Sequence, residues 1–153
     1  MKNIKAVLFD SGRVLNGPVT GHWFITPNFW EYVDKSIFDS LDKIVSDAWP
    51  SLLDVYNENN MTSYFDSIVI SSFLGTSKPD SKMYNTALQE LNIKPEEAIF
   101  IDDSLKNCMG AMAVGINTVL LCRNKQAYIS EKIKSISKGY KVINDLNQLY
   151  KFI

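Results

Sequence analysis

The sequence predicts an α/β fold: a Rossmann-like, doubly wound parallel sheet with helices on both faces. Short apolar runs alternate with stretches of helical periodicity, which is typical of strands joined by crossover helices. The runs are apolar almost throughout, as in parallel strands that are covered on both faces. The length of 153 residues and the 46% hydrophobic content suit one domain with a full core. We therefore expect a single core domain over residues 1–153, without internal repeats.

Six strands are expected, each ending where polar or turn-forming residues begin. The first run is apolar apart from Lys5 and stops at Asp10-Ser11-Gly12. The expected strands are residues 4–9, 43–46, 67–71, 98–102, 117–122 and 141–143.

Five helical patterns alternate with these strands, and local chemistry supports three of their ends. Asn28 and Glu31 have the spacing of a capping box. Pro50 suits a first helical turn, and Gly115 suits a helix C-terminus. The expected helices are residues 29–38, 50–59, 80–91, 104–114 and 125–136.

The composition argues against several classes of partner and location. The 16 Lys and Arg against 17 Asp and Glu give a net charge of -1, so no basic field attracts nucleic acid. The first apolar run is too short for a signal peptide. The uncharged stretches 14–30 and 107–122 contain Gly, Asn or Pro, so we expect no membrane span. Cys108 and Cys122 lie in apolar runs where free thiols are common, which favours a cytoplasmic location.

Polar side chains with catalytic potential follow four of the expected strands. In an open parallel sheet, ligands bind beyond the carboxyl ends of the strands. Asp10, Ser46, Lys78 and the pair Asp102-Asp103 come at or after such ends, where together they can surround one phosphate. Carboxylate oxygens suit Mg²⁺, and Asp10 with Asp103 is a sufficient pair of ligands.

Each of these residues also has a simpler explanation. Asp10 is the kind of residue that forms turns, and Ser46 and Asp103 are the kinds that cap helices. A loop lysine such as Lys78, directly before Pro79, is usually solvated. The functional interpretation therefore depends on these residues acting together.

The motifs resemble those of the haloacid dehalogenase-like hydrolase superfamily, in its phosphatase branch, in the same order along nearly the whole chain. The third and fourth motifs match best. The matching segments are residues 8–15 (LFDSGRVL), 68–72 (IVISS), 78–80 (KPD) and 95–104 (PEEAIFIDDS), with Tyr84, Ala87, Leu88, Asn107, Gly110, Ala111 and Gly115.

This resemblance implies a role in phosphoryl transfer for four residues. Asp10 takes the place of the nucleophile that attacks phosphorus and becomes an aspartyl phosphate. Ser46 and the amide of Asp47 take the places of groups that bind phosphoryl oxygens. Lys78 matches the basic residue that stabilises the phosphoryl charge.

The resemblance also implies Mg²⁺ as a cofactor. Asp10, the carbonyl of Gly12 and Asp103 match the groups that hold the ion. Asp102 is expected to orient this acidic site, and Asn107 falls where relatives often have a further supporting acid.

Two departures from the family pattern bear on activity. Most active phosphatases of the family have a second Asp, serving as general acid and base, where this chain has Gly12. Such help is typically worth about 10² to 10⁴ in rate. In addition, residues 16–42 are too few for the family's helical cap, and they predict a short hairpin flap over 16–27 and one short helix. A cap deletion from a larger ancestor fits the same segment.

The expected function is that of a Mg²⁺-dependent phosphatase or phosphotransferase acting on a small or macromolecular phosphorylated substrate. Two alternatives remain open: a catalytically weak capless remnant that binds a partner, and a metal-independent 2-haloacid dehalogenase. The aromatic residues of segment 22–32 either pack locally or form an exposed patch, and the patch interpretation predicts a homodimer.

Overall fold

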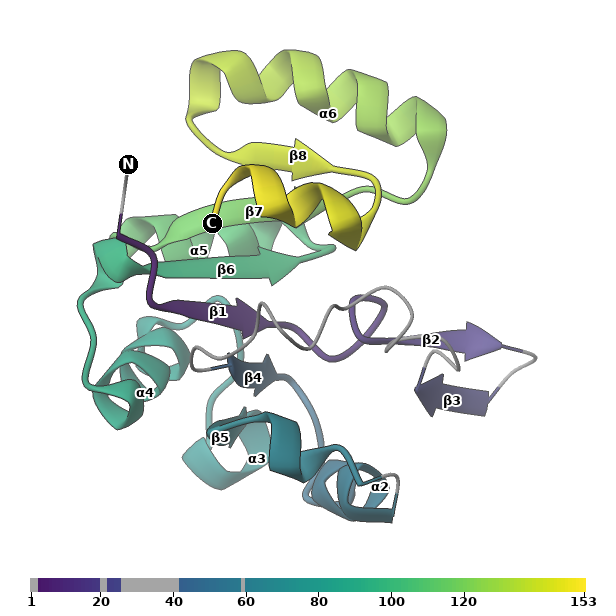
Figure 1. Ribbon diagram of the computed structural model, residues 1–153, viewed down its shortest axis with the longest axis vertical. Coiled ribbons are helices and arrows are strands. Elements are labelled where there is room, and N and C mark those ends of the chain that lie inside the picture. The colour runs from purple at the N-terminus through teal and green to yellow at the C-terminus, as the bar shows by residue number, and fades with distance from the viewer. Residues whose placement is uncertain (1–2, 20–21, 26–41, 59) are drawn as a thin grey trace.

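The protein has an open α/β fold in the computed structural model, which describes residues 3–19, 22–25, 42–58 and 60–153 (Figure 1). Six parallel strands form one sheet in the order β5-β4-β1-β6-β7-β8. The strands are β1 (Ala6–Phe9), β4 (Asp42–Ser46), β5 (Ser67–Ile70), β6 (Ala98–Asp102), β7 (Asn117–Leu121) and β8 (Lys141–Ile143). The predicted doubly wound parallel sheet is confirmed.

Helices follow the strands as the sequence pattern predicts. The helices are α2 (Ser51–Glu58), α3 (Ser71–Leu74), α4 (Ser81–Leu91), α5 (Leu105–Ala113) and α6 (Lys125–Lys138). The described residues also form the short 3₁₀ turns η2 (Thr62–Tyr64), η3 (Pro95–Glu97) and η4 (Leu146–Lys151). Within the described residues, no helix has the length and the apolar character needed to cross a bilayer.

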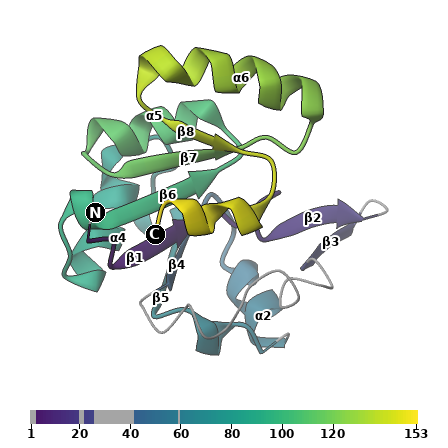
Figure 2. The same ribbon diagram turned by 45° about the horizontal axis from the view of Figure 1, so that its top comes forward.

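Side chains that alternate along the strands build a core on each face of the sheet. Val7 and Phe9 pack with residues of α2 and η4, including Tyr56 and Leu149. Ala6 and Leu8 pack with α4 and α5 on the opposite face. Figure 2 shows the yellow C-terminal turn in front of the sheet and α5 behind it. Burial on both faces explains why the strands read as continuous apolar runs.

A short antiparallel hairpin follows the first strand, as expected for the flap. It pairs β2 (Asn16–Val19) with β3 (His22–Ile25). The expected helix over 29–38, with its Asn28 and Glu31 capping box, lies outside the described residues. So does most of the aromatic segment 22–32, and the predicted homodimer stays a prediction. Within the part of the chain that is described, no helical cap domain separates β1 from β4.

One element differs from the sequence prediction. The expected strand 67–71 ends at Ile70, and Ser71 begins the four-residue helix α3, which no periodicity announces. The other observed bounds lie within two residues of the expected ones. Gly115 adopts a positive φ of 94° just after α5, as its predicted role at a helix end requires.

The order of the strands places a ligand site beside β1. The chain passes from β1 to β4 and β5 on one side, and α4 then returns it to β6 on the other side. Strand order therefore reverses at β1, and the carboxyl ends of β4, β1 and β6 lie next to one another. In open α/β sheets this is where ligands bind.

Candidate active site

Asp10 follows the last residue of β1 and stays tied to the sheet. All four residues of β1 are buried, and the amide of Asp10 still donates to the carbonyl of Ile101 at 2.9 Å. The backbone of Asp10 is thus fixed by the strand ladder, while its carboxylate emerges at the end of the sheet. A side chain at a strand end is held more precisely than one on a free loop.

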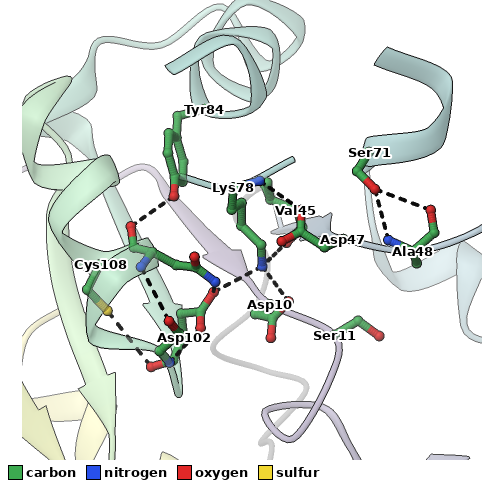
Figure 3. Close-up of polar contacts among 12 residues, drawn as sticks. Asp10, Ser11, Val45, Asp47, Ala48, Ser71, Lys78, Tyr84, Asp102 and Cys108 are labelled. Carbon is green, nitrogen blue, oxygen red and sulfur yellow. Dashed lines mark hydrogen bonds and ion pairs between the residues drawn. The ribbon is translucent and has the colours of Figure 1, made fainter. Parts of the chain in front are cut away.

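Lys78 reaches this carboxylate from the loop after α3. Its side chain is 1% exposed, and its ammonium group has three acceptors (Figure 3). The Nζ atom donates to Asp10 Oδ1 at 2.5 Å, to Asp102 Oδ2 at 3.0 Å and to the carbonyl of Val45 at 3.0 Å. An ammonium has three N–H donors, so this buried cation is fully satisfied. Burial acts to lower the pKa of Lys78, but Asp10 and Asp102 outweigh it, so the pKa is raised and the lysine stays charged.

Asp102 is a fully buried carboxylate at the end of β6. Besides Lys78, it accepts hydrogen bonds from the amide of Ser104 at 2.7 Å and from Asn107 Nδ2 at 3.0 Å. Tyr84 in turn donates to the carbonyl of Asn107 at 2.8 Å. These contacts compensate the cost of burying the charge and fix the orientation of Lys78.

Asp103 lies beside this group and is paired with Arg13. The guanidinium of Arg13 is 3.6 Å from Asp103 Oδ2. Arg13 has a φ of 61°, an unusual backbone conformation for a residue with a side chain. Arg123, which follows β7, donates to the carbonyl of Arg13 at 3.4 Å and to that of Val14 at 3.1 Å. Arg123 therefore ties the loop after Asp10 to the chain that follows β7.

The three aspartates form a cluster that fits a divalent cation. One oxygen from each of Asp10, Asp102 and Asp103 lies within 4.8 Å of the others. Burial raises the pKa of Asp10, which Lys78 opposes and Asp102 reinforces. The pKa of Asp103 is raised by burial and by Asp102. A cation bound among the three carboxylates would offset negative charge beyond that which Lys78 and Arg13 pair with.

All of the site residues predicted from the sequence line one cavity of about 450 Å³. They are Asp10, Gly12, Ser46, Asp47, Lys78, Asp102, Asp103 and Asn107. Asp47 also accepts a hydrogen bond from the amide of Lys78 at 2.8 Å, so it fixes the lysine loop. Ser104 caps α5, so helix capping does not account for Asp103.

The sequence prediction missed several residues of the site. Arg13 and Arg123 were not expected there. Arg13 falls inside the segment 8–15 but was given no role, and Arg123, 110 positions away, belongs to no motif. The link between Ser11 and Tyr56, whose hydroxyls are 2.6 Å apart, was also missed. The motif of residues 8–15, which contains Arg13, was the one available signal for it.

Fold and site together define an α/β protein with a buried lysine and three carboxylates at the switch point of a parallel sheet. The sequence pattern of haloacid dehalogenase-like hydrolases matches residues 44–121, about half of the chain. The chain belongs to this family.

Individual relatives agree with this assignment. A glyceraldehyde 3-phosphate phosphatase from Pyrococcus furiosus is 37% identical over 90 residues, which cover 58% of this chain and 37% of that protein. The matched part of this chain thus spans little more than a third of that relative.

Solved structures share the fold at low sequence identity. A hydrolase of the same superfamily from Ehrlichia chaffeensis has a TM-score of 0.76 at 18% identity, covering 99% of this chain and 97% of that one. The L-2-haloacid dehalogenase of Xanthobacter autotrophicus also has a TM-score of 0.76, at 14% identity, covering 98% of this chain and 99% of that one. Both show that the full core fold is present.

Proposed function

We propose that this protein hydrolyses phosphate monoesters, or transfers their phosphoryl group, through an aspartyl phosphate formed on Asp10. The observation that carries the proposal is the buried ammonium of Lys78, held between Asp10 and Asp102 on the wall of the cavity. Such a cation stabilises charge that develops on a transferring phosphoryl group in a place shielded from water. The phosphatase relative from Pyrococcus furiosus supports the same reaction class.

Each step can be assigned to residues that line the cavity. Asp10 would attack phosphorus while Lys78 neutralises the oxygens of the transferring group. Ser46 and the amide of Asp47, at the end of β4, would bind the remaining oxygens. Because the sheet fixes all of these elements, binding would bring phosphorus to Asp10 at little orientational cost.

Mg²⁺ is part of the proposal. Asp10, the carbonyl of Gly12 and Asp103 would hold the ion. Asp102 would orient Asp10 through Lys78, which contacts both carboxylates. When bound, the cation would neutralise phosphoryl charge that Lys78 alone leaves unbalanced. Arg13 pairs with Asp103 and would keep that carboxylate in place beside the cavity.

Gly12 makes the second half of the reaction the slow one. No side chain at this position can protonate a leaving group or activate the water that releases phosphate. Loss of this help costs roughly 10² to 10⁴ in rate, in the first step wherever the leaving group needs a proton and in the second step for every substrate. We propose that esters with a good leaving group such as p-nitrophenolate, which needs no proton, therefore form the aspartyl phosphate faster than it breaks down. Cys108 and Cys122 are both free thiols, and we propose that the protein acts in the cytoplasm, as the cysteines led us to expect.

Hydrolysis of p-nitrophenyl phosphate tests this function. We expect activity that EDTA removes and that Asp10→Asn abolishes. Glu96→Gln is the matched control, because Glu96 is an exposed carboxyl residue just before β6, at the opposite end of the sheet. Full activity in EDTA or in Asp10→Asn would reject the mechanism.

A metal-independent 2-haloacid dehalogenase remains the second candidate, favoured by the structural likeness to the Xanthobacter autotrophicus enzyme. The same Asp10 would attack carbon and displace halide. Halide release from 2-chloropropionate in EDTA would favour this activity over phosphoryl transfer. The third possibility, a binding protein without turnover, would be supported by Mg²⁺ binding in calorimetry without hydrolysis of any phosphate ester.

A further inference from the structure

The cavity beside Asp10 has two chemically different ends. Charged and polar groups surround Asp10 and Lys78, whereas Trp49, Leu52 and Val55 line the part next to α2. We propose that this apolar wall selects phosphate monoesters whose alcohol part is a compact apolar group, an aromatic ring or short alkyl chain, over polyhydroxylated ones. This inference rests on the proposed function and specifies its substrate class.

Three polar backbone groups of the wall are already paired within the protein. Ser71 Oγ accepts from the amide of Ala48 at 3.1 Å and donates to its carbonyl at 3.3 Å (Figure 3). The carbonyl of Trp49 accepts from the amide of Leu52 at 3.0 Å. A sugar-like alcohol would lose water here and find these partners taken, which is costly for buried hydroxyl groups. An apolar group has no such cost.

The wall exposes large apolar side chains directly beside a charged site. Trp49 is 80% exposed and Val55 38% exposed, so both present apolar surface to the cavity that Asp10 and Lys78 line. Their neighbour Leu52 packs against the core, so α2 is firmly seated on the sheet. The pair of hydroxyls on Ser11 and Tyr56 joins α2 to the loop after Asp10. The apolar wall and the nucleophile therefore keep a fixed separation.

The size of the cavity limits the group that it accepts. Its volume of about 450 Å³ lies in the lower part of the roughly 300–1,000 Å³ typical of small-molecule sites. After a phosphoryl group is seated at Asp10, the remaining space suits one ring or a short chain. The apolar wall and the end that would hold the phosphoryl group belong to one cavity, so we assign the wall to the rest of the substrate.

Binding of alkylphosphonates, which cannot be hydrolysed, tests the inference without requiring turnover. We would measure the affinities of pentylphosphonate and methylphosphonate for the full chain with Mg²⁺ by calorimetry. Each fully buried methylene contributes about fourfold in affinity. Because the wall is partly open, we expect at least about fivefold tighter binding of pentylphosphonate, falling below about twofold in Trp49→Ala.

Two further variants make the outcome unambiguous. Ile136→Ala removes another exposed apolar side chain, on α6, and should leave the ratio of affinities unchanged. Val55→Asn should also lower the ratio, because Val55 lines the same wall. A ratio below about fivefold in the wild type, or the same ratio in Trp49→Ala, would overturn the inference. Failure to hydrolyse p-nitrophenyl phosphate would instead reject the proposed function, whatever the ratio.

Discussion

The position of one ammonium group organises the site at the level of single residues. Lys78 has its three donors directed at two carboxylates and one carbonyl, so neither the lysine nor the buried Asp102 is left unpaired. A sequence shows that Asp10, Lys78 and Asp102 lie near strand ends. It does not show that one lysine bridges both carboxylates, because this depends on how far the loop after α3 reaches across β4.

Removing the lysine should destabilise the protein. In Lys78→Met, Asp10 and Asp102 face each other without a cation, and breaking a buried pair typically costs about 3–5 kcal/mol. Urea unfolding at pH 8 in EDTA measures the loss. Lys125→Met, on the exposed start of α6, is the control and should change stability by less than about 0.5 kcal/mol. A stability equal to that of the wild type would contradict the account of Lys78 as a satisfied buried cation.

The two cysteines should differ in reactivity. Burial raises the pKa of both thiols, and Cys108 is fully buried whereas Cys122 is partly exposed. At neutral pH we expect Ellman's reagent to modify Cys122 slowly and Cys108 only after denaturation. Cys122→Ser should then abolish the reaction of the folded protein. Equal rates for both thiols would be incompatible with this packing.

At the level of elements, a glycine sets how closely α5 approaches the lysine loop. A Cβ atom on Gly110 would lie 2.5 Å from Pro79 Cβ and 2.7 Å from the carbonyl oxygen of Pro79. Neither atom can move without shifting the segment that carries Lys78. The sequence marks Gly110 through the family resemblance, but the neighbour that requires glycine is visible only in the structure.

Gly110→Ala should therefore cost stability and activity together. Overpacking of this kind typically destabilises a protein by about 1–3 kcal/mol, even though alanine is the better helix former. Denaturant unfolding and the hydrolysis rate measure the two effects. Met109→Ala, an exposed neighbour on the same helix, should leave both nearly unchanged. A stabilised Gly110→Ala variant would show that the contact with Pro79 is not tight.

Elements were predictable from the sequence where packing leaves a pattern. The parallel strands are apolar on both faces, and their ends are marked by polar residues such as Asp10 and Ser46. The helix α3 has four residues and no room for periodicity, so it was missed. Arg13 and Arg123 were missed because their contact joins residues far apart in the chain, and no local pattern records it.

At the scale of the whole molecule, topology creates the site. Asp10, Ser46 and Asp102 come from three neighbouring strands, and the reversal of strand order beside β1 brings them to one edge. This is why the candidate site was predictable as a set although each residue had a simpler explanation. The apolar wall beside it was not predictable, because the sequence does not show that Trp49 lines the same cavity as Asp10.

Bound Mg²⁺ should stabilise the folded protein, since the unfolded chain has no assembled site. Saturation at 100 times the dissociation constant would contribute about 2.7 kcal/mol. Thermal unfolding with and without Mg²⁺ measures this effect as a rise in Tm. Asp103→Asn should lose most of the rise, whereas Glu96→Gln should keep it. The same rise in both variants would place the ion elsewhere.

The first turnover of p-nitrophenyl phosphate is the most direct test of phosphoryl transfer to Asp10. Asp10 as nucleophile and Gly12 without an acid–base group together predict a burst of about one equivalent of p-nitrophenol, followed by a slower steady phase. Acid-quenched protein should carry a phosphoryl group on the peptide containing Asp10. Steady release from the start with no modified peptide, or a burst that persists in Asp10→Asn, would contradict the central claim.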